Sequence, residues 1–332
     1  TLFRSVRELP GGSLLHATAG PARVEAFWAP EPPEPLRYRR DEEYAEHLAS
    51  VLGDAVEARL RSATRVGVSL SGGMDSPSVA ALAVERSKRQ EGALPLASFS
   101  WVFDEHPECD ERSWIEPLVS HLGLEATYLL ADPHGPLSDA DTWPVDPSSP
   151  FSNAYERLHQ TLWAAASARG VRTLLVGSGA DRLFAGRQSW LAARVARGHW
   201  GDLFVHLAHL AAEGGALRPW RDPALRALAR QVVPRRTLGG NRAARPPWVT
   251  PGAWALAEGD LASSRLPSGL REQRAASVFS DRSRMRGGAG CPVSRAPVEL
   301  RDPFRDLRVV RFMLTVPPDQ LWRGSARKFI FQ

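Results

Sequence analysis

The chain has 332 residues, of which 43% are hydrophobic and 24% are charged, and its formal net charge is +5 at pH 7, as in a globular protein of one large or two ordinary domains. It has no apolar run long enough to span a bilayer, no pattern typical of a signal peptide and only two cysteines, so we expect a cytoplasmic protein with no membrane partner and no disulfide framework. The arginines are scattered and form no stripe interleaved with aromatic residues, so we expect an anionic small molecule or an acidic peptide as the partner, and no nucleic acid.

The N-terminal part of the chain predicts little buried structure. Residues 1–29 contain short apolar runs between Gly and Pro, which predict short strands and turns that cannot bury a core alone. Residues 30–40 are rich in Pro and charge and are typical of a linker. Residues 41–61 predict an amphipathic helix with Asp41 as its N-cap. Its apolar face consists of Tyr44, Leu48, Val51, Leu52, Ala55 and Leu60.

Residues 65–84 predict a strand, a tight loop and a helix in succession. The apolar run 66–70 suits a strand buried in a parallel sheet. Two glycines then let the backbone approach a bulky anion, while Ser76 is expected to cap the next helix and Pro77 to occupy its first position. A loop that leads into a helix N-terminus is a ready phosphate site. The loop reads Ser71, Gly72, Gly73, Met74, Asp75, Ser76.

Strands and helices alternate after this loop. We expect further strands at 94–103, 125–130 and 171–176, an acidic loop at 104–112, a helix at 113–122 that Pro117 interrupts, and a helix from the N-cap Asn153 to Arg169. This alternation predicts an α/β fold with a doubly wound parallel sheet and a ligand site at the carboxyl ends of its strands.

A second glycine-containing loop follows the strand expected at 171–176. Gly177 and Gly179 come before Asp181, repeating the order of strand, glycines and carboxylate. Asp75 and Asp181 would then face each other across the crevice and share the Mg²⁺ of a bound nucleotide. The alternative interpretation is that Asp181 is a helix N-cap.

The second half is expected to be mostly helical. Residues 187–290 predict short helices and loops rich in Arg, Pro and Gly, with 282–290 as a mobile cover. Trp190, Trp200 and Trp220 are expected in the core. A final segment, 299–306, precedes a helix at 307–314 and a closing run that contains Lys328.

Two motifs resemble those of a known family. The loop 71–76 resembles the SGGxDS pyrophosphate loop of the ATP pyrophosphatase superfamily, and the closing segment resembles the R-x-PF-x-D…P…K pattern of asparagine synthetases. The matching positions of the closing pattern are Arg301, Pro303, Phe304, Asp306 and Lys328.

The resemblance implies an adenine nucleotide alpha hydrolase-like fold and an enzyme that uses ATP and Mg²⁺. Such an enzyme activates a small-molecule or peptide carboxylate as an acyl-adenylate, releases pyrophosphate, and transfers the acyl group to an amine. Lys328 would help hold the phosphates, as a catalytic residue together with Asp181. Ser69, Leu70, Val102 and Phe103 would border the adenine.

The resemblance also implies a domain order. Residues 1–29 resemble the end of a glutaminase domain, and residues 41–332 a synthetase domain whose C-terminus is expected to be truncated, so we expect the chain to be a fragment of a longer protein.

The second loop departs from the family pattern GEGADELFGGY, because Ser178 replaces the first Glu and Arg182 the second. An unaided serine is no acid or base near neutral pH. Three interpretations therefore stay open: an asparagine synthase-like ligase, a lasso-peptide cyclase acting on a precursor peptide, and a nucleotide-binding relative without catalysis. The run Cys109, Asp110, Glu111, Arg112 favours the cyclase branch.

Overall fold

The computed structural model describes residues 9, 12–28, 34–62, 64–89, 96–142, 154–184, 190–212, 222–232, 245, 250–252, 254, 298–323 and 326–331. The expectations for Asn153, Trp220 and the cover at 282–290 lie outside these residues. By its contacts the chain divides into two units, which we describe separately. Unit 1 comprises Thr1–Pro30, Ala45–Leu183 and Ser277–Met313, and unit 2 comprises Glu31–Tyr44, Phe184–Ala276 and Leu314–Gln332.

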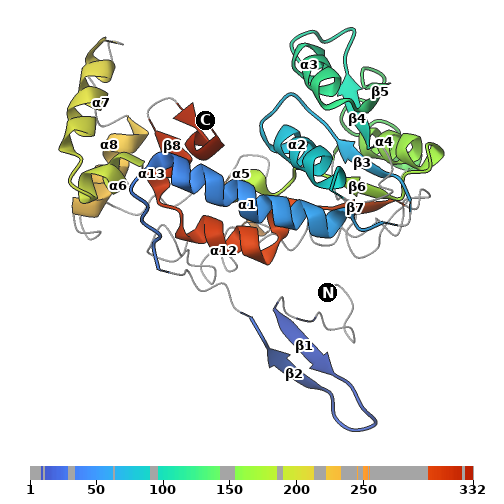
Figure 1. Ribbon diagram of the computed structural model, residues 1–332, viewed down its shortest axis with the longest axis horizontal. Coiled ribbons are helices and arrows are strands. Elements are labelled where there is room, and N and C mark those ends of the chain that lie inside the picture. Colours follow the sequence, from blue (N-terminus) through green and yellow to red (C-terminus); the bar gives the residue numbers. More distant parts are fainter. Residues whose placement is uncertain are drawn as a thin grey trace. The chain divides into compact units, whose positions relative to one another are not determined.

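A five-stranded parallel sheet forms the centre of unit 1 (Figure 1). Its strand order is β5-β4-β3-β6-β7, and every neighbouring pair is parallel. The chain moves outward from β3 to β5 and then returns to the other side of β3, so the order reverses between β3 and β6. The strands are β3 Val66–Ser69, β4 Ala97–Val102, β5 Glu125–Leu130, β6 Thr173–Leu175 and β7 Glu299–Arg301.

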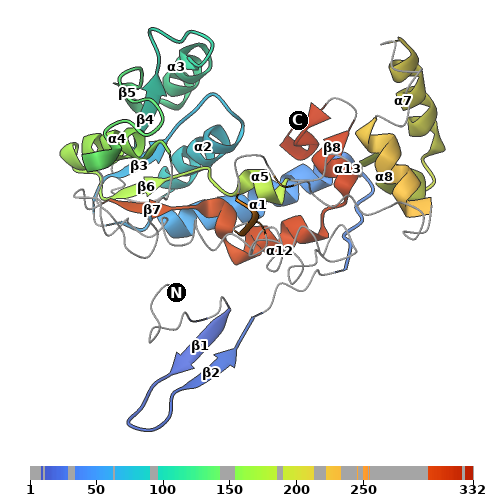
Figure 2. The ribbon, with the colours of Figure 1, turned by 180° about the vertical axis from the view of Figure 1, so that it is seen from behind.

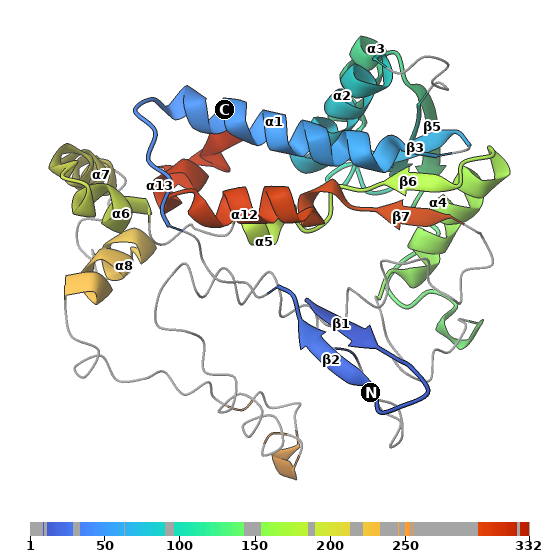
Figure 3. The same ribbon diagram turned by 60° about the horizontal axis from the view of Figure 1, so that its bottom comes forward.

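Helices cover both faces of this sheet, as a doubly wound fold requires. Figure 3 shows α1 and α2 on one side of the sheet and α4 on the other. The side chains of Phe99, Leu162 and Leu174 join α4 to the sheet in a buried cluster. The predicted fold class is therefore confirmed. The helices are α1 Asp41–Leu60, α2 Asp75–Ser87, α3 Arg112–Leu122 and α4 Glu156–Ala168, with a short 3-10 turn η1 at Ala140–Thr142.

Helix α1 follows its amphipathic prediction closely. Tyr44, Leu48, Leu52 and Ala55 are all nearly inaccessible to solvent. Asp41 is the first helical residue rather than the residue before the helix, and its carboxylate accepts hydrogen bonds from the guanidinium of Arg323.

Helix α3 contains Pro117 without a break, so the expected interruption was wrong. A proline in a helix leaves the carbonyl four residues earlier without its partner. Here that residue is Ser113, which is exposed, so water can bond to its carbonyl.

The segment after β7 is fastened to the C-terminal end of α1. Arg301 Nη1 donates to the carbonyls of Arg59 (2.9 Å) and Arg61 (2.6 Å). Asp306 accepts from Arg59 (2.7 Å) and from Arg308 (2.9 Å). Two positions of the closing motif, Arg301 and Asp306, thus tie this segment to the C-terminal end of α1. The 3-10 turn η4 (Pro303–Arg305) lies between them and is followed by α12 (Leu307–Thr315).

The described part of unit 2 is mostly helical, as predicted. Its core contains Trp190 and Leu191, which are 5% and 0% exposed, whereas Trp200 is 58% exposed, so its expected place in the core was wrong. Trp200 is the first residue of its helix and leaves its ring in solvent. The elements are α6 Trp190–Ala196, α7 Trp200–Ala212, α8 Pro223–Val232, α13 Pro318–Leu321, the hairpin strands β8 Trp322–Arg323 and β9 Ala326–Arg327, and the 3-10 turn η5 Phe329–Phe331.

An antiparallel hairpin stands near the N-terminus. Strands β1 (Ser13–His16) and β2 (Arg23–Ala26) pair with each other, and their side chains are almost all exposed. This agrees with short strands that bury no core. Among the described helices, none has the length and apolar character that crossing a membrane requires.

Candidate active site

The two glycine-containing loops meet at the carboxyl ends of β3 and β6. These strands are neighbours, and the strand order reverses between them, which is where open α/β sheets bind ligands. A Cβ on Gly177 would lie 2.8 Å from the backbone nitrogen of Ser76 and 3.1 Å from the carbonyl carbon of Asp75. Only glycine allows this approach. The second loop therefore packs directly on the first turn of α2.

The first loop is closed by its own serines. Ser76 Oγ accepts a hydrogen bond from the backbone N–H of Ser71 (2.9 Å) and lies 3.0 Å from Ser71 Oγ. Helix α2 begins at Asp75, and its N-cap residue is Met74, without a side-chain cap. The expectation that Ser76 caps the helix was therefore wrong, and Pro77 is the third helical residue instead of the first. The hydroxyl of Ser76 closes the loop instead, because its hydrogen bonds are to Ser71, five residues earlier in the chain.

Glu111 already places a carboxylate on the first loop. Its Oε2 accepts a hydrogen bond from the backbone N–H of Gly72 at 3.0 Å. A Cβ on Gly72 would lie 2.9 Å from Trp114 Cβ and 3.1 Å from Glu111 Cβ, so the start of α3 rests against this glycine. The N–H of Gly72 thus donates to an anionic oxygen in this structure, as a phosphate cradle requires.

The loop between β4 and α3 is held by other carboxylates. Asp110 accepts from the N–H of Phe103 (3.0 Å), and Asp132 accepts from the N–H groups of Asp104 (2.8 Å) and Glu105 (3.0 Å). These bonds fix the acidic loop that the sequence predicted after β4.

The residues expected to border the adenine differ in exposure. Leu70 and Val102 are buried in the core, whereas Ser69 and Phe103 are partly exposed. Leu70 continues the sheet through its N–H, which donates to the carbonyl of Phe99 at 2.9 Å. A role for these four residues around an adenine stays a prediction.

The second loop turns sharply into a short helix (Figure 2). Gly179 has φ +89°, a conformation that favours glycine. Helix α5 (Ala180–Leu183) begins at Ala180, so Asp181 lies within its first turn and is not its N-cap residue. Asp181 is exposed and Asp75 is half-buried.

The two carboxylates suit a cation that arrives with a nucleotide. Within the described residues, no group of three or more His, Cys, Asp or Glu side chains is arranged to hold a metal ion. Mg²⁺ in nucleotide sites is usually held by one or two carboxylates together with the phosphates of the substrate. Asp75 and Asp181 fit that smaller set, and their role as ligands stays a prediction.

Asp302 reaches the second loop from the end of β7. Its Oδ2 accepts a hydrogen bond from Ser178 Oγ at 2.9 Å and lies 3.0 Å from Arg305 Nε. Its Oδ1 accepts from the N–H of Phe304 at 3.1 Å. Burial raises the pKa of Asp302 to about 6, against the lowering effects of Ser178, Arg305 and the Phe304 N–H. The carboxylate of Asp302 therefore lies beside Ser178, where the local sequence offers only a serine hydroxyl.

Sequence reasoning did not identify Glu111 and Asp302 as members of the site. Glu111 was noted only as part of an acidic run, and Asp302 only as the variable position of the closing motif. Each contacts a loop that lies far away along the chain, 39 residues away for Glu111 and 124 for Asp302. The signal available was the type of residue, a carboxylate directly after a strand or before a helix.

Lys328 belongs to unit 2. Its φ is +52°, in the left-handed region, and its Nζ lies 5.7 Å from the centre of the Phe184 ring. Non-glycine residues in this conformation are uncommon and are enriched at functional positions. Its predicted role on the phosphates stays a prediction.

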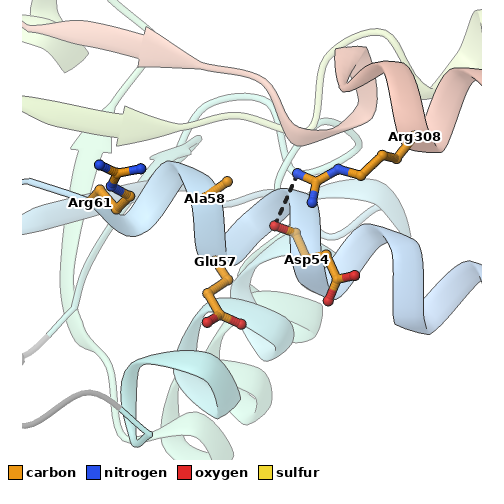
Figure 4. A pocket seen from close by; sticks show the side chains of 5 residues that line it. All are labelled: Asp54, Glu57, Ala58, Arg61 and Arg308. Carbon is orange, nitrogen blue, oxygen red and sulfur yellow. Dashed lines mark hydrogen bonds between the residues drawn. The ribbon is translucent and has the colours of Figure 1, made fainter.

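A separate pocket of about 360 Å³ lies on α1 and α12 (Figure 4). Asp54, Glu57, Ala58, Arg61 and Arg308 line it, and Arg308 donates across it to the carbonyl of Asp54 at 3.3 Å. No residue of the two loops lines this pocket. It is a charged surface hollow and does not belong to the site.

Comparisons with known proteins identify a family and several distant relatives. The model of a family described as "Asparagine synthase" matches residues 47–332. The chain is 28% identical over 205 residues to "Amidase chyE" of Penicillium rubens. The aligned region covers 58% of this chain and 30% of that protein. It is 29% identical over 195 residues to "Putative asparagine synthetase (glutamine-hydrolyzing)" of Mycobacterium bovis. That aligned region covers 56% of this chain and 28% of the relative. The matched region thus spans about three-tenths of the length of these relatives. An NMN synthetase structure from Francisella tularensis aligns with a TM-score of 0.29 and 22% identity, covering 44% of this chain and 58% of that one.

Proposed function

This chain belongs to the asparagine synthase family, and we propose on that premise that it is part of an ATP-dependent, AMP-forming carbon–nitrogen ligase. It activates a carboxylate as an acyl-adenylate and passes the acyl group to an amine. The observation that carries the proposal is the packing of Gly177 on the backbone of Asp75 and Ser76, which supports one anion site built from two loops.

The first step is attack by a carboxylate oxygen on the α-phosphorus of ATP. A new P–O bond forms, the bond between the α-phosphorus and the bridging oxygen breaks, and pyrophosphate leaves with that electron pair. Backbone N–H groups of the first loop and the N-terminus of α2 would donate to the leaving group, that of Gly72 in place of its bond to Glu111. Asp75 and Asp181 would hold Mg²⁺ beside the phosphates, where it would neutralise part of their charge.

The second step is attack by an amine on the activated carbonyl carbon. The C–N bond forms, AMP leaves with the electron pair of the C–O bond, and one proton is lost from the amine nitrogen.

The identity of the two substrates goes beyond the family. One relative is described as an amidase and another as an asparagine synthetase, so a small amino-acid carboxylate and a nitrogen donor are the substrates we propose first. A peptide carboxylate is the alternative. Neither relative reported above is described as a lasso-peptide cyclase, so we do not carry that interpretation forward. A cytoplasmic location is part of the proposal, because it supplies ATP and keeps an exposed thiol such as Cys109 reduced.

The test is exchange of labelled pyrophosphate into ATP with a panel of carboxylates that includes L-aspartate, L-glutamate and short acidic peptides. We expect exchange that depends on one member of the panel, with AMP as the nucleotide product. Formation of ADP and phosphate would reject the proposal. Binding of ATP with no exchange for any carboxylate would instead favour the nucleotide-binding relative without catalysis, which the substitution of Ser178 makes the second candidate.

A further inference from the structure

The second loop carries no carboxylate at position 178, but a carboxylate from a distant segment fills the space beside it. Ser178 Oγ donates to Asp302 Oδ2 at 2.9 Å, and a Cβ on Gly179 would lie 3.2 Å from the same oxygen. Asp302 follows β7 directly, and β7 is the sheet neighbour of β6, which leads into the loop. The sheet order itself therefore brings this pair together at the carboxyl edge.

We propose that Ser178 and Asp302 act as a pair that accepts the proton of the attacking amine. Ser178 Oγ is the group that meets the amine, and Asp302 is the positioning residue behind it. This inference rests on the proposed function, because it assigns the proton of its second step.

The surroundings of Asp302 suit a proton acceptor that is held in a fixed position. Its side chain is 11% exposed, and the N–H of Phe304 holds the oxygen that does not face Ser178. The charged groups that act on it are Arg305, 3.0 Å from Oδ2, and Arg59 on α1. Because burial disfavours the charged form, its pKa of about 6 lies far closer to neutrality than that of an ordinary aspartate. The carboxylate is thus mostly ionised at pH 7 but takes up a proton readily.

The proton movement balances with the bond changes. As the amine nitrogen bonds to the carbonyl carbon, its N–H proton passes to Ser178 Oγ while the Ser178 hydroxyl proton passes to Asp302 Oδ2. AMP departs with the electron pair of the C–O bond. Asp302 ends protonated and returns the proton to solvent.

The pairing is tested first without any substrate. Carboxyl groups of aspartate are labelled with ¹³C in the full chain, and the Asp302 signal is assigned by its loss in Asp302→Asn. We expect it to titrate near pH 6, and Ser178→Ala to move its pKa upward, because the hydrogen bond from Ser178 favours the charged form. An Asp302 signal that is unchanged by Ser178→Ala would overturn the proposal, whatever the substrate is.

The catalytic part is tested with MgATP, hydroxylamine as the amine, and the carboxylate that supports pyrophosphate exchange. Asp302→Asn should lower hydroxamate formation by about 10²-fold more than it lowers exchange. Ser178→Glu in the Asp302→Asn chain restores a carboxylate beside the loop and should recover at least about tenfold of the loss. Equal losses of hydroxamate formation and exchange in Asp302→Asn, or no recovery in the double variant, would overturn the proposal.

The matched control is Asp306→Asn, four residues further along the same segment. Asp306 binds Arg59 and Arg308 rather than the second loop. Its replacement should lower thermal stability without changing the ratio of hydroxamate formation to exchange. Absence of exchange in the unmodified chain would reject the proposed ligase function. It would not decide whether Ser178 and Asp302 form a pair, because the titration of Asp302 tests that separately.

Discussion

Lys328 combines a rare residue type with a rare backbone conformation. It is one of two lysines in a chain with 42 basic residues, and its φ is +52°. An ammonium on a flexible stem reaches between phosphate oxygens where a planar guanidinium does not fit. Lys328→Arg should therefore lower the rate of pyrophosphate release by about 10²-fold, and the loss should appear in kcat.

The control for Lys328 is Lys88→Arg. Lys88 is the exposed C-cap residue of α2, and its replacement should leave the rate unchanged within about twofold. Small and equal effects of the two replacements in one assay would show that Lys328 is an ordinary surface lysine.

Asp75 stands at the first position of α2, where the two loops meet. Asp75→Asn keeps the shape of the side chain and removes its charge, so it should abolish pyrophosphate exchange while the far-UV circular dichroism and melting temperature change little. Asp54→Asn, on the separate pocket of α1, is the control and should leave exchange intact. Exchange near the level of the unmodified chain in Asp75→Asn would remove Asp75 from the site.

At the scale of elements, the contact between the second loop and α2 depends on a missing Cβ. Gly177→Ala would place a carbon 2.8 Å from the backbone nitrogen of Ser76. A backbone atom inside a helix cannot move away as a flexible side chain can. We expect a loss of about 1–3 kcal/mol in the free energy of unfolding by urea, together with a loss of exchange.

Gly201→Ala is the matched control for this crowding. Its Cβ would meet nothing within 4 Å, and the residue lies inside α7. It should be neutral or stabilising, because alanine is the better helix former. A Gly177→Ala variant as stable and active as Gly201→Ala would contradict the close approach of the two loops.

The ion pairs of Asp306, which tie the segment after β7 to α1, should make the free energy of unfolding depend on pH. Hydrogen bonds from Arg308 and then Arg59 hold the pKa of Asp306 well below its usual 3.8. A carboxylate with a lowered folded-state pKa stabilises the fold above its unfolded pKa and loses this contribution as the pH falls. Asp306→Asn should therefore cost about 1–3 kcal/mol at pH 7, and the difference from the unmodified chain should shrink below about pH 4.

Glu85→Gln is the control in these urea titrations. The exposed pair of Glu85 and Arg89 is of the kind that contributes little to stability. A constant difference between Asp306→Asn and the unmodified chain from pH 7 down to pH 3 would contradict the role given to this ion pair.

The elements that sequence predicted best are those with a strong local pattern. Strands β3 and β5 and helix α1 were predicted within one or two residues, because continuous apolar runs and a 3.6-residue period are local signals. Strand β7 was not predicted. It has three residues, Glu299–Arg301, with no apolar run, and it becomes a strand only because β6 pairs with it.

The site shows the same limit. Both glycine-containing loops were predictable, because each is a short run of glycines and a carboxylate directly after an apolar run. The hydrogen bond between Ser178 and Asp302 was not, since it joins residues 124 positions apart through the sheet. The interpretation that position 178 leaves the loop without an acid–base group followed the local motif and overlooked its neighbour in space.

For the whole molecule, we propose that the protein joins a carboxylate to an amine through an acyl-adenylate. The family covers residues 47–332, while the relatives reported above are more than three times as long as the part of them that this chain matches. The chemistry of the domain can therefore be tested before the partners supplied by the rest of such a protein are known.

The most direct measurement follows an oxygen atom. The carboxylate that supports exchange is prepared with ¹⁸O in its carboxyl group and incubated with the full chain, MgATP and hydroxylamine, and the AMP is analysed by mass spectrometry. An acyl-adenylate requires that one ¹⁸O pass from the carboxylate into the phosphate of AMP, and this is the result we predict. AMP without ¹⁸O, or ¹⁸O in inorganic phosphate alongside ADP, would contradict the account.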